Sequence, residues 1–171
     1  TQFLTSWNKN ASTYRTYSRG QETRGQLGNG GGLSGAAEDQ SRWTYMSNMD
    51  GAIQLTGGTT TMALDRNGDA FSVGQNTVGE LGNGAAGTDT ANFASIKAGE
   101  TAYYNGGNTT DNIKNVVAVD TSMGNARKAD DKSNRNAGLS AAIISSGEVF
   151  AWGTNDFGQL GDKIIGTDPI T

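Results

Sequence analysis

The residue types that most often carry enzyme chemistry are missing from this sequence of 171 residues. It contains no Cys and no His, which removes thiolate nucleophiles, imidazole bases and the usual ligands of zinc and haem. The 17 Asp and Glu residues leave one route open, a carboxylate pair of the glycosidase kind. Such a pair is recognised by its separation in space and by one raised pKa. The sequence therefore assigns no catalytic residue and favours a non-enzymatic protein, with a glycan-active enzyme as the minor alternative.

Two further patterns resemble ligand sites but fail on spacing. The segment Asp65–Asp69 (DRNGD) begins like a calcium loop, yet its Gly stands at the fourth position and Asn76 at the twelfth. A helix–loop–helix calcium motif needs Gly at the sixth position and a bidentate Glu at the twelfth, so a hairpin turn is predicted instead. The Gly-rich stretches lack the Lys-Ser/Thr or the following helix of a phosphate cradle. Neither a metal nor a cofactor is expected.

The charge pattern argues against nucleic acid as a partner. The chain carries 13 basic and 17 acidic residues, a formal net charge of -4, and no basic stripe that could neutralise a phosphate backbone. Its main basic cluster contains Arg127 and Lys128 but is interrupted by Asp130 and Asp131, which is typical of a solvated loop. No apolar run approaches the ~18 residues of a membrane span.

The composition predicts a folded chain with many turns and a thin core. Gly accounts for 26 residues, roughly twice the usual share, and mean hydropathy is -0.54. Aromatic and β-branched residues are spread along the chain, unlike in disordered segments. The length suits a single domain over residues 1–171, or a fragment of a larger one. Because the chain opens at Thr1 rather than Met, we expect a processed or truncated product.

The strongest signal is a Gly-rich turn that occurs three times, at Gly20–Gly30, Gly74–Gly84 and Gly153–Lys163. The shared pattern is G-x-x-x-x-G-[QE]-L-G, and its chance recurrence is very improbable. Internal repeats of this kind indicate a repeat architecture. The fixed positions are Gly20, Gly25, Leu27 and Gly28 in the first copy, Gly74, Gly79, Leu81 and Gly82 in the second, and Gly153, Gly158, Leu160 and Gly161 in the third.

Short apolar runs precede the second and third turns and align without a gap. Thr59–Gly74 and Leu139–Gly153 each contain two runs joined by a link ending in Gly, a pattern typical of a β-hairpin. Further upstream, Gly51–Gly58 and Asn115–Ser122 are rich in apolar and β-branched residues and suit a buried inner strand. Each repeat is therefore predicted to contain at least three strands.

The hairpin and turn together resemble the repeat of the regulator of chromosome condensation family. The third copy, AAIISSGEVFAWGTNDFGQLG, matches closely, whereas Val73 and Arg19 stand at the position of its Trp152. Thr60 and Leu139 replace the family's usual His. The resemblance implies an all-β fold, a partial β-propeller of about three irregular antiparallel blades, with repeat units near 1–34, 35–94 and 95–171. The family's founding activity is nucleotide exchange on a small nuclear GTPase, but none of its loop residues can be mapped, so the resemblance transfers a fold and no site.

Two stretches lengthen the third repeat, at 98–112 and 124–136, and have the polar composition of long surface loops. Protruding loops on a rigid frame often bind partners, which makes Tyr103, Tyr104, Arg127 and Lys128 candidate contacts. The alternative for the two tyrosines is that they pack on opposite faces of a strand. The segment Thr1–Asn8 also leaves two alternatives open, an outer strand of the first blade or the end of a short N-terminal helix.

These patterns together predict a non-enzymatic function. We expect a protein-interaction or adhesion module with a protein or glycan partner. Chains that lack Cys and are acidic and rich in Asn, Thr, Gly and Ser are frequent among secreted and cell-surface bacterial proteins, so an extracellular location is expected. The alternative is a structural subunit of a fibre or pilus-like filament that self-associates through exposed strand edges.

Overall fold

The fold is all-β, as predicted. The computed structural model describes residues 1–31, 33, 40–46, 48–98, 111–122, 138–154 and 158–161, and within them every regular element is a strand of one of three antiparallel sheets. Sheet 1 contains β1 (Gln2–Asn8), β2 (Thr13–Gly20) and β3 (Gln40–Tyr45); sheet 2 contains β4 (Gln54–Gly57), β5 (Thr60–Leu64), β6 (Ala70–Gly74) and β7 (Thr90–Ser95); sheet 3 contains β8 (Val116–Thr121), β9 (Leu139–Ile144) and β10 (Val149–Gly153).

The central hairpins of sheets 2 and 3 have the same register, which confirms the gap-free alignment of their sequences. Thr60 pairs with Gly74 in sheet 2, and Leu139 pairs with Gly153 in sheet 3. The tight links between the strands contain Gly68 at φ 78° and its counterpart at φ 93°, a conformation that favours glycine. Positions of the two sheets can therefore be compared residue by residue.

The three sheets are consecutive propeller blades of unequal completeness. In sheets 1 and 2 the Gly-rich turn joins the same two strands, β2 to β3 and β6 to β7, so β1 corresponds to β5. Sheet 1 thus has equivalents of the three outer strands, and sheet 3 has equivalents of the three inner ones. The Gly-rich turn connects two strands of the same sheet, so β3, which follows the first turn, pairs with β2 in sheet 1. The first repeat unit proposed from the sequence ends at residue 34, before β3.

The N-terminal segment is a strand, so the alternative of a short N-terminal helix is wrong. Residues from Gln2 to Asn8 pair continuously with β2, from Gln2 opposite Arg19 to Asn8 opposite Thr13. Pairing with a neighbouring strand satisfies the backbone groups that a helix would have satisfied internally. The described residues contain no helix long and apolar enough to cross a membrane.

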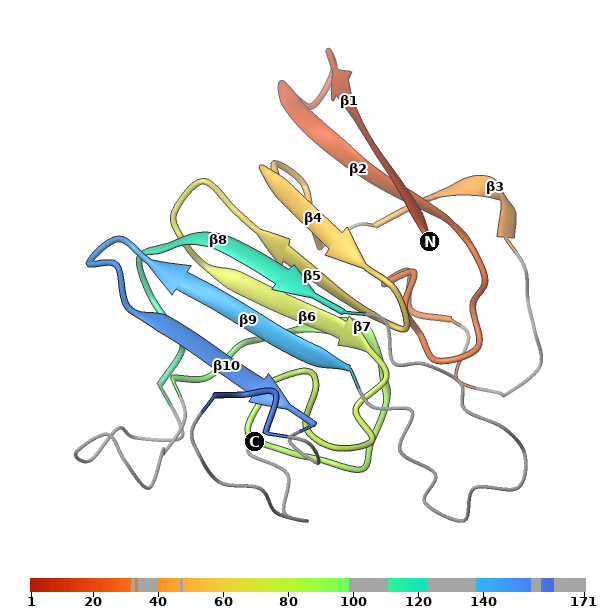
Figure 1. Cartoon of the computed structure of the whole chain (residues 1–171). Coiled ribbons are helices and arrows are strands. Elements are labelled where there is room, and N and C mark those ends of the chain that lie inside the picture. Colours follow the sequence, from red (N-terminus) through yellow and green to blue (C-terminus); the bar gives the residue numbers. More distant parts are fainter. Residues whose placement is uncertain are drawn as a thin grey trace.

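Two apolar layers separate the three sheets, which lie one after another in Figure 1. Between sheets 2 and 3 the buried side chains are Met62, Leu64, Ala70, Ile96, Ile113, Val116, Val119, Ala142 and Trp152. Between sheets 1 and 2 they are Met46, Met49 and Ala63, with Phe3, Leu55, Phe71 and Phe93 packed against them. Sheet 2 therefore packs one face against sheet 1 and the other against sheet 3, as expected of stacked blades.

The inner strands β4 and β8 lie at the edges of their sheets and are joined by side-chain hydrogen bonds. Gln54 donates a hydrogen bond from Nε2 to the carbonyl of Val119 (2.7 Å) and accepts one at Oε1 from its N–H (3.1 Å). Thr56 donates to Asp120 Oδ1 at 2.9 Å. The two Gln54 bonds satisfy backbone groups of β8, which among the described strands pairs with β9 alone.

Candidate interaction surface

The first and second Gly-rich turns dock on the following sheet through equivalent hydrogen bonds. The carbonyl of Gln26 in the first turn accepts a bond from Thr61 Oγ1 of β5 at 2.8 Å. The carbonyl of Glu80 in the second turn accepts one from Ser140 Oγ of β9 at 2.8 Å. Gln26 and Glu80 occupy the same place in the turn, and both are buried. The turn is therefore the element that joins one blade to the next.

Glycine allows this docking because an aromatic ring lies directly against the turn. A Cβ on Gly82 would lie 2.6 Å from Nε1 of Trp152, and a Cβ on Gly28 would lie 2.4 Å from the ring of Phe93. Trp152 also donates from Nε1 to the Glu80 carbonyl at 2.9 Å. Val73, which stands at the Trp position in sheet 2, is too small for this contact, and Phe93 of β7 supplies the ring in its place.

The structure brings the predicted turn residues together at the first two blade junctions and leaves the third turn more open. Leu27 and Leu81 are both 0% exposed, whereas Leu160 is half-buried and Gly161 is exposed. A Cβ on Gly161 would meet no heavy atom of the described residues within 4 Å. The glycines at the fixed positions of the three turns all have positive φ: Gly20, Gly25, Gly28, Gly74, Gly79, Gly82, Gly153, Gly158 and Gly161.

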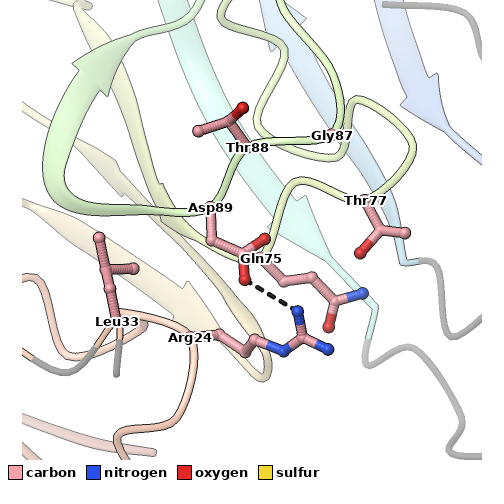
Figure 2. A pocket seen from close by; sticks show the side chains of 7 residues that line it. All are labelled: Arg24, Leu33, Gln75, Thr77, Gly87, Thr88 and Asp89. Atoms are coloured by element: carbon pink, nitrogen blue, oxygen red, sulfur yellow. Dashed lines mark hydrogen bonds and ion pairs between the residues drawn. The ribbon is translucent and has the colours of Figure 1, made fainter. Parts of the chain in front are cut away.

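A small polar pocket lies where the first and second turns meet (Figure 2). Its volume is about 450 Å³. An ion pair crosses it, with Arg24 Nη1 2.9 Å from Asp89 Oδ2, and Gln75 and Thr77 complete one wall. The described residues contain no group of three or more carboxylates that could hold a metal ion. Arg24 and Asp89 neutralise each other in this ion pair. The pocket therefore offers little attraction to an anionic or cationic ligand.

The face of sheet 1 that points away from sheet 2, called here the open face of sheet 1, is the more distinctive surface. Its side chains follow from the strand register, because residues directly opposite each other lie on the same face: Gln2, Leu4 and Ser6 of β1, Arg15, Tyr17 and Arg19 of β2, and Trp43 and Tyr45 of β3. The opposite face carries Phe3, Thr16 and Ser18, which face sheet 2; Thr16 and Ser18 are fully buried. Leu4 is 43% exposed and Trp43 is 38% exposed.

Arginine and aromatic side chains alternate across this open face. The Arg15 guanidinium lies 4.9 Å from the ring centre of Tyr45, and that of Arg19 lies 4.6 Å from the ring centre of Trp43. The rings of Tyr17 and Tyr45 are 5.7 Å apart. Such cation–π contacts hold the side chains in place. Arg15 Nε is buried, and no hydrogen-bond acceptor for it is found among the described residues.

Sequence reasoning did not identify this face, although part of its signal was present. The alternation in Arg15, Tyr17 and Arg19 puts all three on one side of a strand. Their stacking on β3 depends on a register shift between Ser18 and Gly20, which no local pattern gives. The four contact residues proposed from the sequence, Tyr103, Tyr104, Arg127 and Lys128, lie outside the described residues.

Glu80 is a titratable residue buried at the junction between sheets 2 and 3. Burial raises the pKa of the Glu80 carboxyl, while hydrogen bonds from the Val78 N–H and from Gln75 lower it less. Val78 N donates to Glu80 Oε2 at 2.8 Å. At the first junction the N–H of Arg24 makes the same contact with Oε1 of Gln26, also at 2.8 Å. The Glu80 carboxyl therefore accepts a hydrogen bond from the backbone of its own turn.

Comparisons with known proteins agree with this architecture. Residues 146–168 match the model of the regulator of chromosome condensation (RCC1) repeat. The structure is similar to human WBSCR16, with a TM-score of 0.59 and 19% identity over 93% of this chain and 35% of that one. It is also similar to Prp20p of Saccharomyces cerevisiae, studied for its binding to Gsp1p and histones, with a TM-score of 0.60 and 14% identity over 99% of this chain and 36% of that one. Yeast RCC1 (Prp20) bound by Kap60 gives a TM-score of 0.57 and 13% identity over 99% and 35%. No curated protein sequence matches the chain.

The stacked antiparallel sheets and the docking turns define a partial β-propeller. The chain spans about a third of the length of the three solved structures to which it is similar, which agrees with the predicted three partial blades. The match to the repeat of the regulator of chromosome condensation family lies at residues 146–168, which include β10 and the third turn.

Proposed function

We propose that this chain is a non-enzymatic protein-interaction module and that the open face of sheet 1 is its contact surface. The observation that carries the proposal is the composition of that face. Tyr, Trp and Arg are enriched at protein interfaces and among the residues that dominate binding energy. Here Arg15, Arg19, Tyr17, Tyr45 and Trp43 lie on one sheet face, already stacked on one another.

The arrangement also lowers the cost of binding. A partner that covers this face needs to order few side chains, because the two guanidinium groups are held against rings and Tyr45 donates a hydrogen bond to Asp50 at 2.8 Å. Side-chain ordering otherwise costs ~0.5–1.5 kcal/mol per long side chain. The frame behind the face is rigid, since Thr16 and Ser18 donate to backbone carbonyls at 2.6 and 2.7 Å.

We further propose, from composition alone, that the module works outside the cell, in a secreted or cell-surface protein with an adhesion role. A chain without Cys and rich in Gly and polar residues supports this proposal. The prediction that nucleic acid is not a partner also stays a prediction. Fractionation of the producing cells with an antibody against the chain tests the location, and recovery in the cytoplasm alone would count against it.

Photo-cross-linking tests the contact surface directly. Ser6 lies opposite Arg15 on the open face and is exposed, so a benzophenone amino acid at this position should form a protein adduct of defined mass in the natural producer. Ala86, exposed in the second turn, is the control position and should yield no such adduct. Equal labelling from both positions, or from neither, would contradict the proposal, and the adduct mass identifies the partner.

A further inference from the structure

Two uncovered aromatic side chains lie near the tip of the β1–β2 hairpin. Trp7 and Tyr14 are directly opposite each other in the strand register, and their ring centres are 5.1 Å apart in an edge-to-face arrangement. They are 55% and 43% exposed. Figure 1 shows this hairpin extending beyond the nearby end of β4. Aromatic side chains gain much from burying their large apolar area, so a stacked pair left this open suits a group that covers it.

The exposure of this ring pair does not depend on what lies beyond the open face of sheet 1. Alternation along β1 and β2 puts Trp7 and Tyr14 on the same side as Phe3 and Thr16, which is the side packed against sheet 2. Arg66, in the β5–β6 hairpin of sheet 2, lies 5.7 Å from the ring centre of Tyr14. The neighbouring blade is therefore in place, and the rings stay exposed because the β1–β2 hairpin extends past it.

The loop between β1 and β2 contains an acceptor sequence for N-linked glycans. Asn10, Ala11 and Ser12 form the pattern N-x-S/T, which marks a glycosylation acceptor in a secreted protein. All three residues are exposed. The strand pairing ends at Asn8 opposite Thr13, so the loop lies outside the ladder. Exposed loop tips are the places where modifying enzymes reach a folded chain most easily.

The local structure leaves the acceptor side chain free. The Asn8 side chain closes the turn, because its Oδ1 accepts hydrogen bonds from the N–H groups of Asn10 and Ala11, both at 3.0 Å. The side-chain amide of Asn10 and the hydroxyl of Ser12 make no hydrogen bond with any residue in the described part of the chain. Ser12 has a φ of 49°, so the chain turns sharply after the acceptor. Both polar groups of the pattern are therefore accessible to an enzyme.

We propose that Asn10 carries an N-linked glycan whose first sugar packs on the Trp7–Tyr14 ring pair. This ring pair is the next pair of the ladder after Asn8 and Thr13, about 3.4 Å from the start of the loop, and so within reach of a sugar on Asn10. The C–H groups of one pyranose face suit the electron-rich face of an aromatic ring. The inference rests on the proposed extracellular location and not on the open face of sheet 1.

The modification is a balanced group transfer. Nδ2 of Asn10 attacks the anomeric carbon of a sugar that is linked through pyrophosphate to a lipid carrier. The new N–C bond replaces the bond between that carbon and the phosphate oxygen, the lipid pyrophosphate leaves, and the amide loses one of its two protons. The lipid-linked donor and a membrane-bound glycosyltransferase are supplied by the producing cell. The hydroxyl of Ser12 is the second group that such an enzyme reads.

Mass spectrometry of the full chain from its natural producer tests the modification. The peptide that contains Asn10 should carry a glycan. Ser12→Ala should abolish it, whereas Ser12→Thr should keep it, because the hydroxyl is retained. Unmodified Asn10 in a chain recovered outside the cell would overturn the inference and leave the proposed location standing. Unmodified Asn10 in a chain recovered only from the cytoplasm would remove both.

Thermal unfolding tests the contact between the sugar and the rings. The other N-x-S/T pattern, at Asn108, lies outside the described residues, so every chain compared carries Asn108→Gln. Asn10→Gln, which removes the acceptor, should lower the melting temperature by about 2–4 °C. With Trp7→Thr this difference should disappear although Asn10 stays occupied. Val117→Thr on β8, also at a side chain that is 55% exposed, is the matched control and should keep the difference. An equal difference in both backgrounds, or none in the unmodified rings, would overturn the packing on the ring pair.

Discussion

Glu80 carries a carboxyl where the equivalent residue of the first turn, Gln26, carries an amide. Gln26 makes the same hydrogen bond to the turn backbone without a charge, and burial raises the pKa of Glu80. A carboxyl with a raised pKa in the folded state binds more protons there than in the unfolded chain, so stability falls as pH rises from the ordinary Glu pKa through the raised one.

We therefore expect Glu80→Gln to flatten this decline and to raise the melting temperature at neutral pH relative to the unmodified chain. The amide keeps the bond from Val78 and removes the buried charge. Thermal unfolding followed by circular dichroism at several pH values between 4 and 8 measures the effect, and an unchanged pH slope would show that the charge is well solvated.

Gly82 tests the aromatic contact at the second junction. Gly82→Ala adds a Cβ that would lie 2.6 Å from Trp152, at φ 60°. Gly87 has a similar φ of 83° but nothing within 4 Å, so Gly87→Ala reports the backbone strain alone. We expect Gly82→Ala to cost more in the free energy of unfolding than its control by about 1–3 kcal/mol, the usual cost of overpacking. Urea titration measures both, and equal losses would mean that the ring moves away freely.

At the scale of elements, Gln54 makes the hydrogen bonds that connect its side chain on the inner strand β4 to the backbone of the inner strand β8. Gln54→Met keeps the volume but leaves the N–H and C=O of Val119 without their two bonds. We expect a loss of about 1–3 kcal/mol in the free energy of unfolding, the cost of unsatisfied polar groups. Gln40→Met on β3, also half-buried, is the matched control and should lose less. A loss no larger than the control's would mean that water replaces the side chain.

The elements also show what sequence could and could not predict. The hairpin Thr60–Gly74 and the three turns were predictable because their signals are local, a Gly at a tight link and a fixed run of residues around Leu81. The strand β1 was left between two alternatives, since its apolar pattern is irregular and only pairing with β2 decides it. The open face of sheet 1 was not predicted. Sheet 2 packs against one side of β2 and so decides which side faces outward, and no local pattern in the sequence gives that packing.

At the scale of the whole molecule, the blades form an array with unlike ends. One end is rich in Arg and aromatic residues, and the other is aliphatic around Ile143 and Val149. Propellers usually close into a ring, and this chain spans about a third of the length of the solved structures to which it is similar. The end that is rich in Arg and aromatic residues carries the proposed contact surface.

Hydrogen–deuterium exchange of the full chain, alone and with the partner identified through the Ser6 cross-link, tests the proposed contact surface most directly. The account predicts that amides of β1 and β2 gain protection when the partner is added, while those of β5 and β6, already between two sheets, do not change. No gain in protection, or a gain confined to the outer strands β3 and β10, would contradict it, because contact would then be absent or made through strand edges.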